Sequence, residues 1–194
     1  MNQLRKLVLA SASPRRAELL TQIGVKFSVM PADLDESPLA GEQPEALVKR
    51  LAAEKAKAAA QVHKDTEGCV VLASDTVVVL DNQALGKPND FADAAAMLGA
   101  LSDRTHQVMT AVSLLDGTRQ ETICVTTQVH FGPLSATQIA RYWATGEPVD
   151  KAGAYGIQGI AGQFVKSIEG SYSAVVGLPL YETVQLLQEF GVIE

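Results

Sequence analysis

The sequence contains no apolar run that approaches the roughly 20 residues of a membrane-spanning helix. The amino-terminal stretch MNQLRKLVLASAS has only a short apolar segment, which continues into a charged region and indicates a first core strand rather than a secretory signal. The two cysteines, Cys69 and Cys124, each lie beside an apolar strand-like run, which favours reduced, buried thiols over a disulfide or a metal site. These features predict a soluble cytoplasmic protein with no membrane partner.

The sequence also lacks a surplus of basic residues. Its 22 Asp and Glu outnumber its 16 Lys and Arg, so the net charge is −6, and aromatic residues make up only 5%. No basic stripe interleaved with aromatics is present, which disfavours a nucleic-acid-binding surface. A local anion site is still compatible with this balance of charge.

Several familiar motifs are missing as well. The sequence has no P-loop, no dinucleotide-binding fingerprint and no nucleophile elbow. The three histidines, His63, His106 and His130, have no metal-ligand spacing with one another or with the cysteines. We interpret all three as surface or strand-end residues.

The pattern of apolar residues predicts an α/β domain. Residues 1–194 show no repeat, low-complexity tract or long linker, and we expect a single domain. Strands are predicted at 6–10, near 27–30, at 69–81, 106–116 and 121–131, and near 163–169. Helices are predicted at 14–23, 44–62, 90–101, 135–145 and 179–190. The turn DGTRQ at 116–120 favours a hairpin between its flanking strands, so the sheet is expected to be mixed and flanked by helices.

An arginine pair breaks the local rules at the start of the first helix. Ser13 and Pro14 are typical of an N-cap and a first helical residue, which places Arg15 and Arg16 in the first turn. Cations there are disfavoured by roughly 0.3–1 kcal/mol, because the free N–H groups carry partial positive charge. The pair is either solvated on a surface helix, or it binds an anion together with these N–H groups and the nearby serine hydroxyls.

A second anomaly is Asp75, which interrupts the nearly continuous apolar run VVLASDTVVVL. Such a run is typical of a strand covered on both faces, where an unpaired carboxylate costs several kcal/mol. Asp75 is either capped by backbone N–H groups at a bulge or strand end, or it is a base or metal ligand at a functional cleft.

Lys55 is the third anomaly, because it prolongs the apolar stripe of the helix at 44–62 one turn beyond Leu51. The side chain either extends to solvent past small alanines, or reaches an acidic or phosphate partner between helix and sheet.

Two loops and a glycine-rich segment supply further candidates. Asp33, Asp35 and Glu36 form an acidic loop, which is either solvated or provides oxygen ligands for Mg²⁺ or Mn²⁺. Lys87 lies in a turn after the strand that carries Asp75. The segment DKAGAYGIQGIAGQF at 150–164 suits a close approach of a ligand or of another backbone, and its Gln158 could read a base edge.

Several blocks of the sequence, in order, carry a family resemblance. They are LASASPRRAELL, LAAEKA, ASDTVV, GKP, GEPVDKAGAYGIQG and GSYSAVVGLPL, and together they span nearly the whole chain. They resemble the Maf (septum-formation-inhibitor-like) nucleoside triphosphate pyrophosphatases. The resemblance implies an α/β fold like that of inosine triphosphate pyrophosphatases, with a cleft between two lobes. It also implies a nucleoside triphosphate substrate, a divalent metal (Mg²⁺ or Mn²⁺) and, as is frequent in the family, a homodimer.

The resemblance also implies roles for individual residues. Asp75 becomes the proton acceptor for the attacking water, and Glu36 a carboxylate of the metal site. The phosphate and site residues are Ser13, Arg15, Arg16, Lys55 and Lys87. Specificity in the family follows the positions occupied here by Arg15, Thr76 and Gln158, and this combination is similar to that of the branch acting on dTTP and UTP.

Two functions of different classes therefore remain open. The first is a pyrophosphatase that converts dTTP and UTP, and modified pyrimidine nucleotides, to the monophosphate and pyrophosphate. The alternative is a regulator of cell division that binds a nucleotide without hydrolysing it.

Overall fold

The computed structural model describes residues 2–31, 33–62, 68–117 and 119–194. Its seven-stranded mixed sheet has the order β2-β1-β3-β5-β6-β7, with β4 also beside β3. The strands are β1 (Leu7–Leu9), β2 (Phe27–Val29), β3 (Val70–Leu80), β4 (Gln83–Leu85), β5 (Thr105–Asp116), β6 (Arg119–Phe131) and β7 (Val165–Glu169). The helices are α1 (Pro14–Gln22), α2 (Pro44–Val62), α3 (Phe91–Leu101), α4 (Ala136–Trp143), α5 (Tyr172–Val176) and α6 (Leu180–Glu189).

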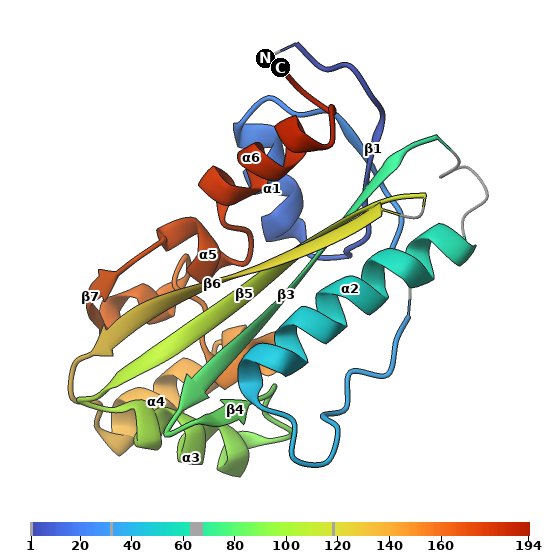
Figure 1. Cartoon of the computed structure of the whole chain (residues 1–194). Helices are drawn as coiled ribbons and strands as arrows, with labels where there is room; N and C mark the ends of the chain where they lie inside the picture. Colours follow the sequence, from blue (N-terminus) through green and yellow to red (C-terminus); the bar gives the residue numbers. More distant parts are fainter. Residues whose placement is uncertain (1, 32, 63–67, 118) are drawn as a thin grey trace.

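Helices cover both faces of this sheet, which confirms the predicted α/β class (Figure 1). Side chains alternate between faces along β3. Val71 and Ala73 pack in one apolar cluster with α2, whereas Val70 and Leu72 pack on the opposite face in a cluster that includes α1 and α6. Burial on both faces explains why β3 is an almost unbroken apolar run.

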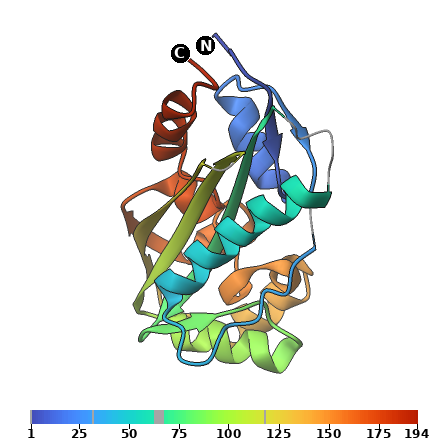
Figure 2. The same ribbon diagram turned by 45° about the vertical axis from the view of Figure 1, so that its right-hand side comes forward.

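Two groups of helices share the face of the sheet opposite α2. Figure 2 shows α1 and α6 near the chain termini, and α3 and α4 toward the other end of the long strands. Each group has its own apolar cluster, one around Leu20 and Leu187 and the other around Leu98 and Phe131. The long strands β3, β5 and β6 connect the two groups.

The predicted hairpin is confirmed by the antiparallel pairing of β5 with β6, from Asp116 opposite Arg119 to Thr105 opposite His130. The helix starts predicted at Pro14 and Pro44 are also confirmed. Ser135 caps α4 in a capping box with Gln138, so the helix itself begins one residue later than expected. Cys69 is buried as predicted, whereas Cys124 is only partly buried.

Short elements account for what sequence patterns missed. β4 has three residues and α5 has five, too few to show a period. The glycine-rich segment and the residues just before it form three 3₁₀ helices, Glu147–Asp150, Ala152–Ala154 and Ile160–Phe164. Among the described helices, none is long and apolar enough to cross a membrane.

One histidine is more deeply buried than a strand-end position alone indicates. His106 lies at the start of β5, as expected of a strand-end residue, but it is buried rather than on the surface. Its Nε2 is 2.7 Å from the Tyr155 hydroxyl, and its ring packs edge-on against Phe131. His130 is partly exposed, and His63 lies outside the described residues.

One edge of β3 changes neighbours along its length. The parallel pairing with β1 ends at Leu72, and the antiparallel pairing with β4 begins at Val78. Within the described chain, residues 73–77 have no strand on that side, while the other edge is paired with β5 from Val71 to Val79. Side chains from both faces of β3 can reach a common space through this gap.

Gly153 provides a test of how the glycine-rich segment packs on β3. Its φ is +65°, and a Cβ there would lie 2.9 Å from the Val78 side chain. We expect Gly153→Ala to lower the free energy of unfolding by roughly 2–4 kcal/mol, because left-handed strain and overpacking add. Gly41→Ala is the control, since Gly41 has φ +74° and open space, and should cost only about 1 kcal/mol. Urea unfolding measures both, and equal losses would contradict close packing at Gly153.

The burial of the His106 imidazole predicts that the stability of the protein depends on pH. Burial lowers its pKa from 6.5 to about 4. The unfolded chain therefore binds more protons than the folded one between these values, and the stability from the neutral imidazole is lost as pH falls through this window. The loss amounts to about 3 kcal/mol below pH 4. Denaturant unfolding at pH 7 and pH 4.5 should show a smaller drop in His106→Gln than in the unmodified protein. His130→Gln should keep the original drop, and an unchanged drop in both variants would contradict this assignment.

Candidate active site

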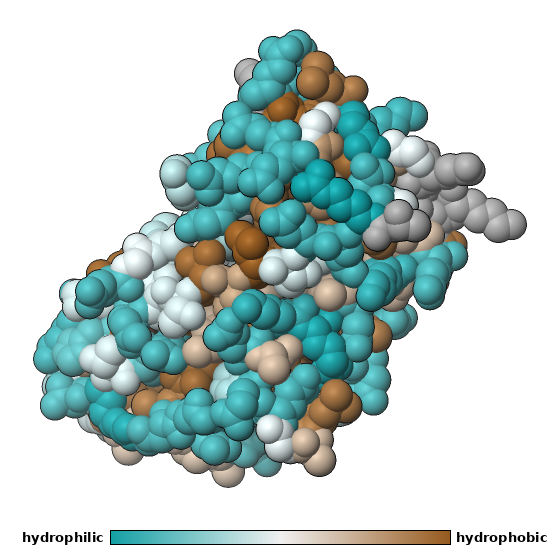
Figure 3. All heavy atoms as spheres, in the orientation of Figure 1, coloured by the Kyte–Doolittle hydropathy of each residue, from teal (hydrophilic) through white to brown (hydrophobic). Residues whose placement is uncertain are grey.

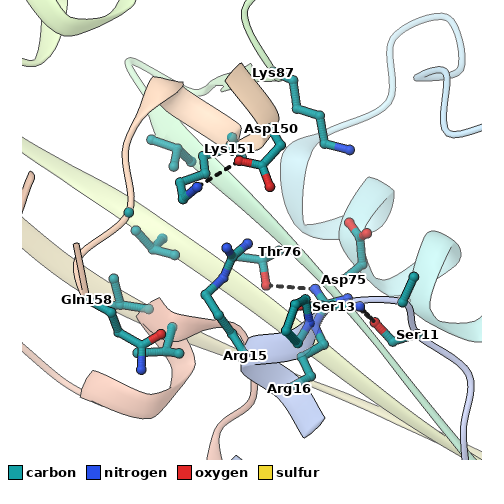
Figure 4. Close-up of a pocket in the computed structure, with 18 of the residues that line it drawn as sticks. Ser11, Ser13, Arg15, Arg16, Asp75, Thr76, Lys87, Asp150, Lys151 and Gln158 are labelled. Atoms are coloured by element: carbon teal, nitrogen blue, oxygen red, sulfur yellow. Dashed lines mark hydrogen bonds and ion pairs between the residues drawn. The ribbon is translucent and has the colours of Figure 1, made fainter. Parts of the chain in front are cut away.

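A cavity of about 710 Å³ opens at the gap in the edge of β3. All nine residues that the sequence analysis proposed for the site line it: Ser13, Arg15, Arg16, Glu36, Lys55, Asp75, Thr76, Lys87 and Gln158. They come from α1, the loop before α2, α2 itself, β3, the loop after β4 and the glycine-rich segment. The structure thus brings together residues up to 145 positions apart, from Ser13 to Gln158 (Figure 4). Their individual roles remain predictions.

The start of α1 forms one wall. Ser13 is the N-cap in extended conformation, and its hydroxyl makes no capping hydrogen bond to the helix. The Ser11 hydroxyl accepts a hydrogen bond from the Ser13 backbone N–H at 3.2 Å. The amino-terminal end of the helix and these two serines therefore border the same cavity, an arrangement typical of anion sites.

The two arginines of α1 differ in position. Figure 4 shows Arg15 extending into the cavity, whereas Arg16 turns toward Ser11 and Thr76. Arg16 donates hydrogen bonds through Nη1 to Ser11 Oγ at 3.1 Å and through Nη2 to Thr76 Oγ1 at 3.3 Å. Its Nε donates to the Gly177 carbonyl at 2.9 Å. Burial lowers the pKa of Arg16, and the nearby Asp75 carboxylate opposes this shift. The guanidinium remains charged, because arginine is not deprotonated in proteins. Its three hydrogen bonds hold this charge against the sheet.

Asp75, Lys55 and Glu36 form a charged cluster in the cavity wall. The Lys55 ammonium lies 2.7 Å from Asp75 Oδ1 and 2.6 Å from Glu36 Oε1, and the Lys55 side chain is 13% exposed. Lys55 thus reaches an acidic partner between helix and sheet, the second of its two interpretations. Asp75 is likewise paired with a cation at a cleft rather than capped at a strand end.

Burial and charge act against each other on the two carboxylates. Burial raises the pKa of Asp75 above its ordinary value, although Lys55 and Arg16 act to lower it. At Glu36 burial also acts to raise the pKa, but Lys55, Lys87 and Arg16 outweigh it and the net shift is downward. The cavity therefore holds two nearby carboxylates of different basicity, and Asp75 is the better proton acceptor.

The acidic loop divides between the cavity and solvent. Asp33 lines the cavity with Glu36, whereas Asp35 is exposed and its carboxylate accepts a hydrogen bond from the Ser37 backbone N–H at 3.0 Å. Lys87, after β4, is exposed at the cavity rim and is close enough to Glu36 to help lower the pKa of that carboxylate.

The glycine-rich segment forms the wall that carries Gln158. Glu147 accepts hydrogen bonds from the Tyr142 hydroxyl at 2.9 Å and from the Ile160 backbone N–H at 2.8 Å. These bonds hold the loop bearing Gln158 against α4. A Cβ at Gly159 would overlap the Glu147 carboxylate, which explains the need for glycine beside this contact.

Sequence reasoning missed three charged residues in this wall, Glu147, Asp150 and Lys151. Lys151 donates to Asp150 Oδ1 at 2.7 Å and to the Glu147 carbonyl at 2.9 Å, and its side chain is 15% exposed. The available signal was the occurrence of charged residues within and just before a segment otherwise rich in glycine and apolar residues. Alone, that signal does not separate cavity residues from surface ones.

The donor set is compatible with a divalent metal. Within the described residues no cluster of three or more His, Cys, Asp or Glu could hold an ion. Glu36 and Asp75 nevertheless both contact one cation, the Lys55 ammonium. The two carboxylates are therefore close enough together to bind the same positive ion. Mg²⁺ is frequently bound by one or two carboxylates plus substrate phosphates, and this pair fits that pattern.

The face in Figure 3 is mostly hydrophilic, with small, separated hydrophobic areas. A second, shallower hollow of about 390 Å³ between β6 and α6 contains none of the proposed residues.

Comparison with known proteins places the chain in a family. Residues 6–190 match the family described as Maf-like protein. A dTTP/UTP pyrophosphatase of Pseudoalteromonas atlantica is 57% identical over 95% of this chain and 97% of its own length. A dTTP/UTP pyrophosphatase of Vibrio vulnificus is 55% identical over 96% of this chain and all of its own length. A solved structure of a nucleoside-triphosphatase/dITP/XTP pyrophosphatase from Mycobacterium abscessus aligns with a TM-score of 0.44 and 15% identity, over 95% of this chain and 94% of its own. The family match over nearly the whole chain and the identities above 50% establish that this chain belongs to the Maf family.

Proposed function

We propose that this chain is a nucleoside triphosphate pyrophosphatase that hydrolyses dTTP and UTP to the monophosphate and pyrophosphate. The observation that carries the proposal is Asp75, a buried carboxylate of raised pKa, in a cavity that is also lined by arginine and lysine side chains. The similarity to two dTTP/UTP pyrophosphatases supports the same reaction and the same pair of substrates.

The polyphosphate binds along the wall formed by α1. Arg15 extends into the cavity, Lys87 lies at its rim, and residues of the first turn of α1 line the same space. An anion there removes the electrostatic cost of placing arginines at a helix start. Arg16 has five N–H groups and gives three of them to protein acceptors, so two are available to phosphate oxygens.

Asp75 accepts the proton of the attacking water. The water oxygen forms a bond to the α-phosphorus as the bond to the pyrophosphate oxygen breaks, and one water proton moves to Asp75. The leaving group departs as pyrophosphate, next to cations that stabilise its charge. A raised pKa makes Asp75 a stronger base than an exposed carboxylate, and Lys55 holds it oriented at 2.7 Å.

A divalent metal completes the proposed site. The described lining contains five cationic and five acidic residues, so it offers no net positive charge to a triphosphate. Glu36 and Asp75 would hold Mg²⁺ or Mn²⁺ together with phosphate oxygens. The metal would neutralise phosphate charge and lower the pKa of bound water.

The base lies against the part of the cavity that contains Thr76 and Gln158. Val78 and Val108, opposite each other on β3 and β5, provide an apolar surface next to Thr76. Gln158 is exposed in the same cavity, where its amide can donate and accept hydrogen bonds to a base edge. The Arg15 side chain extends from the first turn of α1 toward this region (Figure 4).

The reaction is tested by incubating the purified chain with Mg²⁺ or Mn²⁺ and dTTP, UTP, CTP, GTP, 7-methyl-GTP or ITP. Separation of products distinguishes monophosphate plus pyrophosphate from diphosphate plus phosphate. We expect monophosphate from dTTP and UTP. Tight binding of these nucleotides without turnover would contradict the enzyme and favour a nucleotide-binding regulator.

Asp75→Asn separates catalysis from binding. Loss of the proton acceptor should reduce kcat at least about a hundredfold, as for general bases elsewhere. Nucleotide affinity, measured by calorimetry with metal present, should change much less. Asp35→Asn is the matched control, because Asp35 is exposed on the acidic loop and should retain kcat. An equal loss of affinity and turnover in Asp75→Asn would mean that Asp75 anchors the metal or the fold instead.

A further inference from the structure

Thr110 lies directly beneath the proposed base site. It is opposite Thr76 in the pairing of β3 with β5, and it is fully buried. Its Oγ1 is 3.0 Å from Thr76 Oγ1, and it donates a hydrogen bond to the Ala174 carbonyl at 2.7 Å. Thr110 itself does not line the described cavity, whereas Thr76 does.

The direction of the bond between the two threonines follows from counting protons. A threonine hydroxyl has one proton and two lone pairs. Because Thr110 gives its proton to Ala174, the proton between the two hydroxyls must come from Thr76. Arg16 Nη2 donates to Thr76 Oγ1 at 3.3 Å and occupies one lone pair. The second lone pair remains for the cavity, so Thr76 presents an acceptor there and no donor.

We propose that Thr110 is a positioning residue that determines which pyrimidines this site accepts. By holding the Thr76 proton it makes Thr76 an acceptor for N3–H, a donor that uracil and thymine share. Cytosine carries an unprotonated N3 at the same place, and two acceptors facing each other leave both unpaired. The inference rests on the proposed function and deepens it, since it assigns a basis for selecting UTP and dTTP over CTP.

The surroundings of Thr76 favour N3–H as the atom in contact. Thr76 and Val78 point to the same face of β3, and their partners on β5 are Thr110 and Val108. The two pairs form a floor with a polar end and an apolar end. A pyrimidine ring lying over the valines places its edge at Thr76, and N3–H is the sole donor on the pairing edge of uracil and thymine.

Thr110→Val tests the proposal, because valine has the same shape and lacks the hydroxyl. The Thr76 proton is then free to point at N3 of cytosine. We expect the ratio of kcat/KM for UTP over CTP to fall about tenfold, roughly the contribution of one hydrogen bond. Thr110→Ser retains the hydroxyl and should keep the ratio within about twofold of the unmodified protein.

Thr127→Val is the matched control for a purely structural effect. Thr127 is equally buried on β6, and its hydroxyl donates to the Ser171 carbonyl at 3.2 Å, outside the cavity lining. It should lose stability like Thr110→Val but keep the UTP-to-CTP ratio. An unchanged ratio in Thr110→Val, or an equal change in Thr127→Val, would overturn the proposal.

Two substrate analogues test the same idea on the unmodified protein, whatever the folding of the variants. UTP methylated at N3 lacks the donor and should lose at least about tenfold in kcat/KM relative to UTP. 4-Thio-UTP keeps N3–H and should stay within a few-fold of UTP. Equal use of UTP and its N3-methyl analogue would overturn the role of Thr110. If neither UTP nor dTTP is hydrolysed, the proposed function itself fails, which the unmodified protein alone reveals.

Discussion

Strand β3 is paired along one edge with β5, but on the other edge it changes partner from β1 to β4 and has a gap between them. The rest of the site depends on this gap. Asp75 and Thr76 are neighbours in sequence and therefore point to opposite faces of the sheet. Both line one cavity because the missing strand leaves the edge between them open. A continuous sheet would have separated the proposed base from the proposed specificity residue.

The helices on the two faces of the sheet each place a cationic side chain at this opening. Helix α2 places Lys55 against Asp75 on one face, and α1 with the Gly177 backbone places Arg16 against Thr76 on the other. Lys55 is held by two carboxylates and Arg16 by neutral oxygen acceptors, all within the protein. These contacts restrict the rotamers of both cations before a ligand binds. Such preorganisation avoids ordering costs at the moment of binding and makes electrostatic stabilisation of a polyphosphate more effective.

Hydrogen bonds beneath the cavity fix which hydroxyl groups donate and which accept. Ser74 and Arg16 both donate to the Gly177 carbonyl, at 2.9 Å each, and Thr110 donates to the Ala174 carbonyl. These carbonyls belong to α5 and the residue after it, an element of five helical residues that carries no side chain in the proposed chemistry. In a region of low dielectric, fully satisfied chains of this kind hold their protons in one arrangement.

The sequence by itself determined the fold class, the main strands and helices, and the residues that violate local rules. Period-two and buried-run patterns identify β3 and the hairpin of β5 and β6, because these signals reside in contiguous residues. Arg15, Lys55 and Asp75 were conspicuous because each has a local electrostatic or solvation cost that only a partner can offset. Short elements such as β4 and α5 carry no such pattern, and their formation depends on the sheet already present.

Only the tertiary structure decided how those residues are used. Arg15 and Arg16 look equivalent in sequence, but their different directions depend on Gly177, more than 160 residues away. The charges of Glu147, Asp150 and Lys151 resemble surface charges until the glycine-rich segment folds over the sheet. Thr110 lies within an apolar strand and has no local anomaly, and its hydrogen-bond direction is set by contacts with β3 and α5. Sequence patterns report costs that arise within a few residues, whereas partners and proton positions are set by contacts between distant ones.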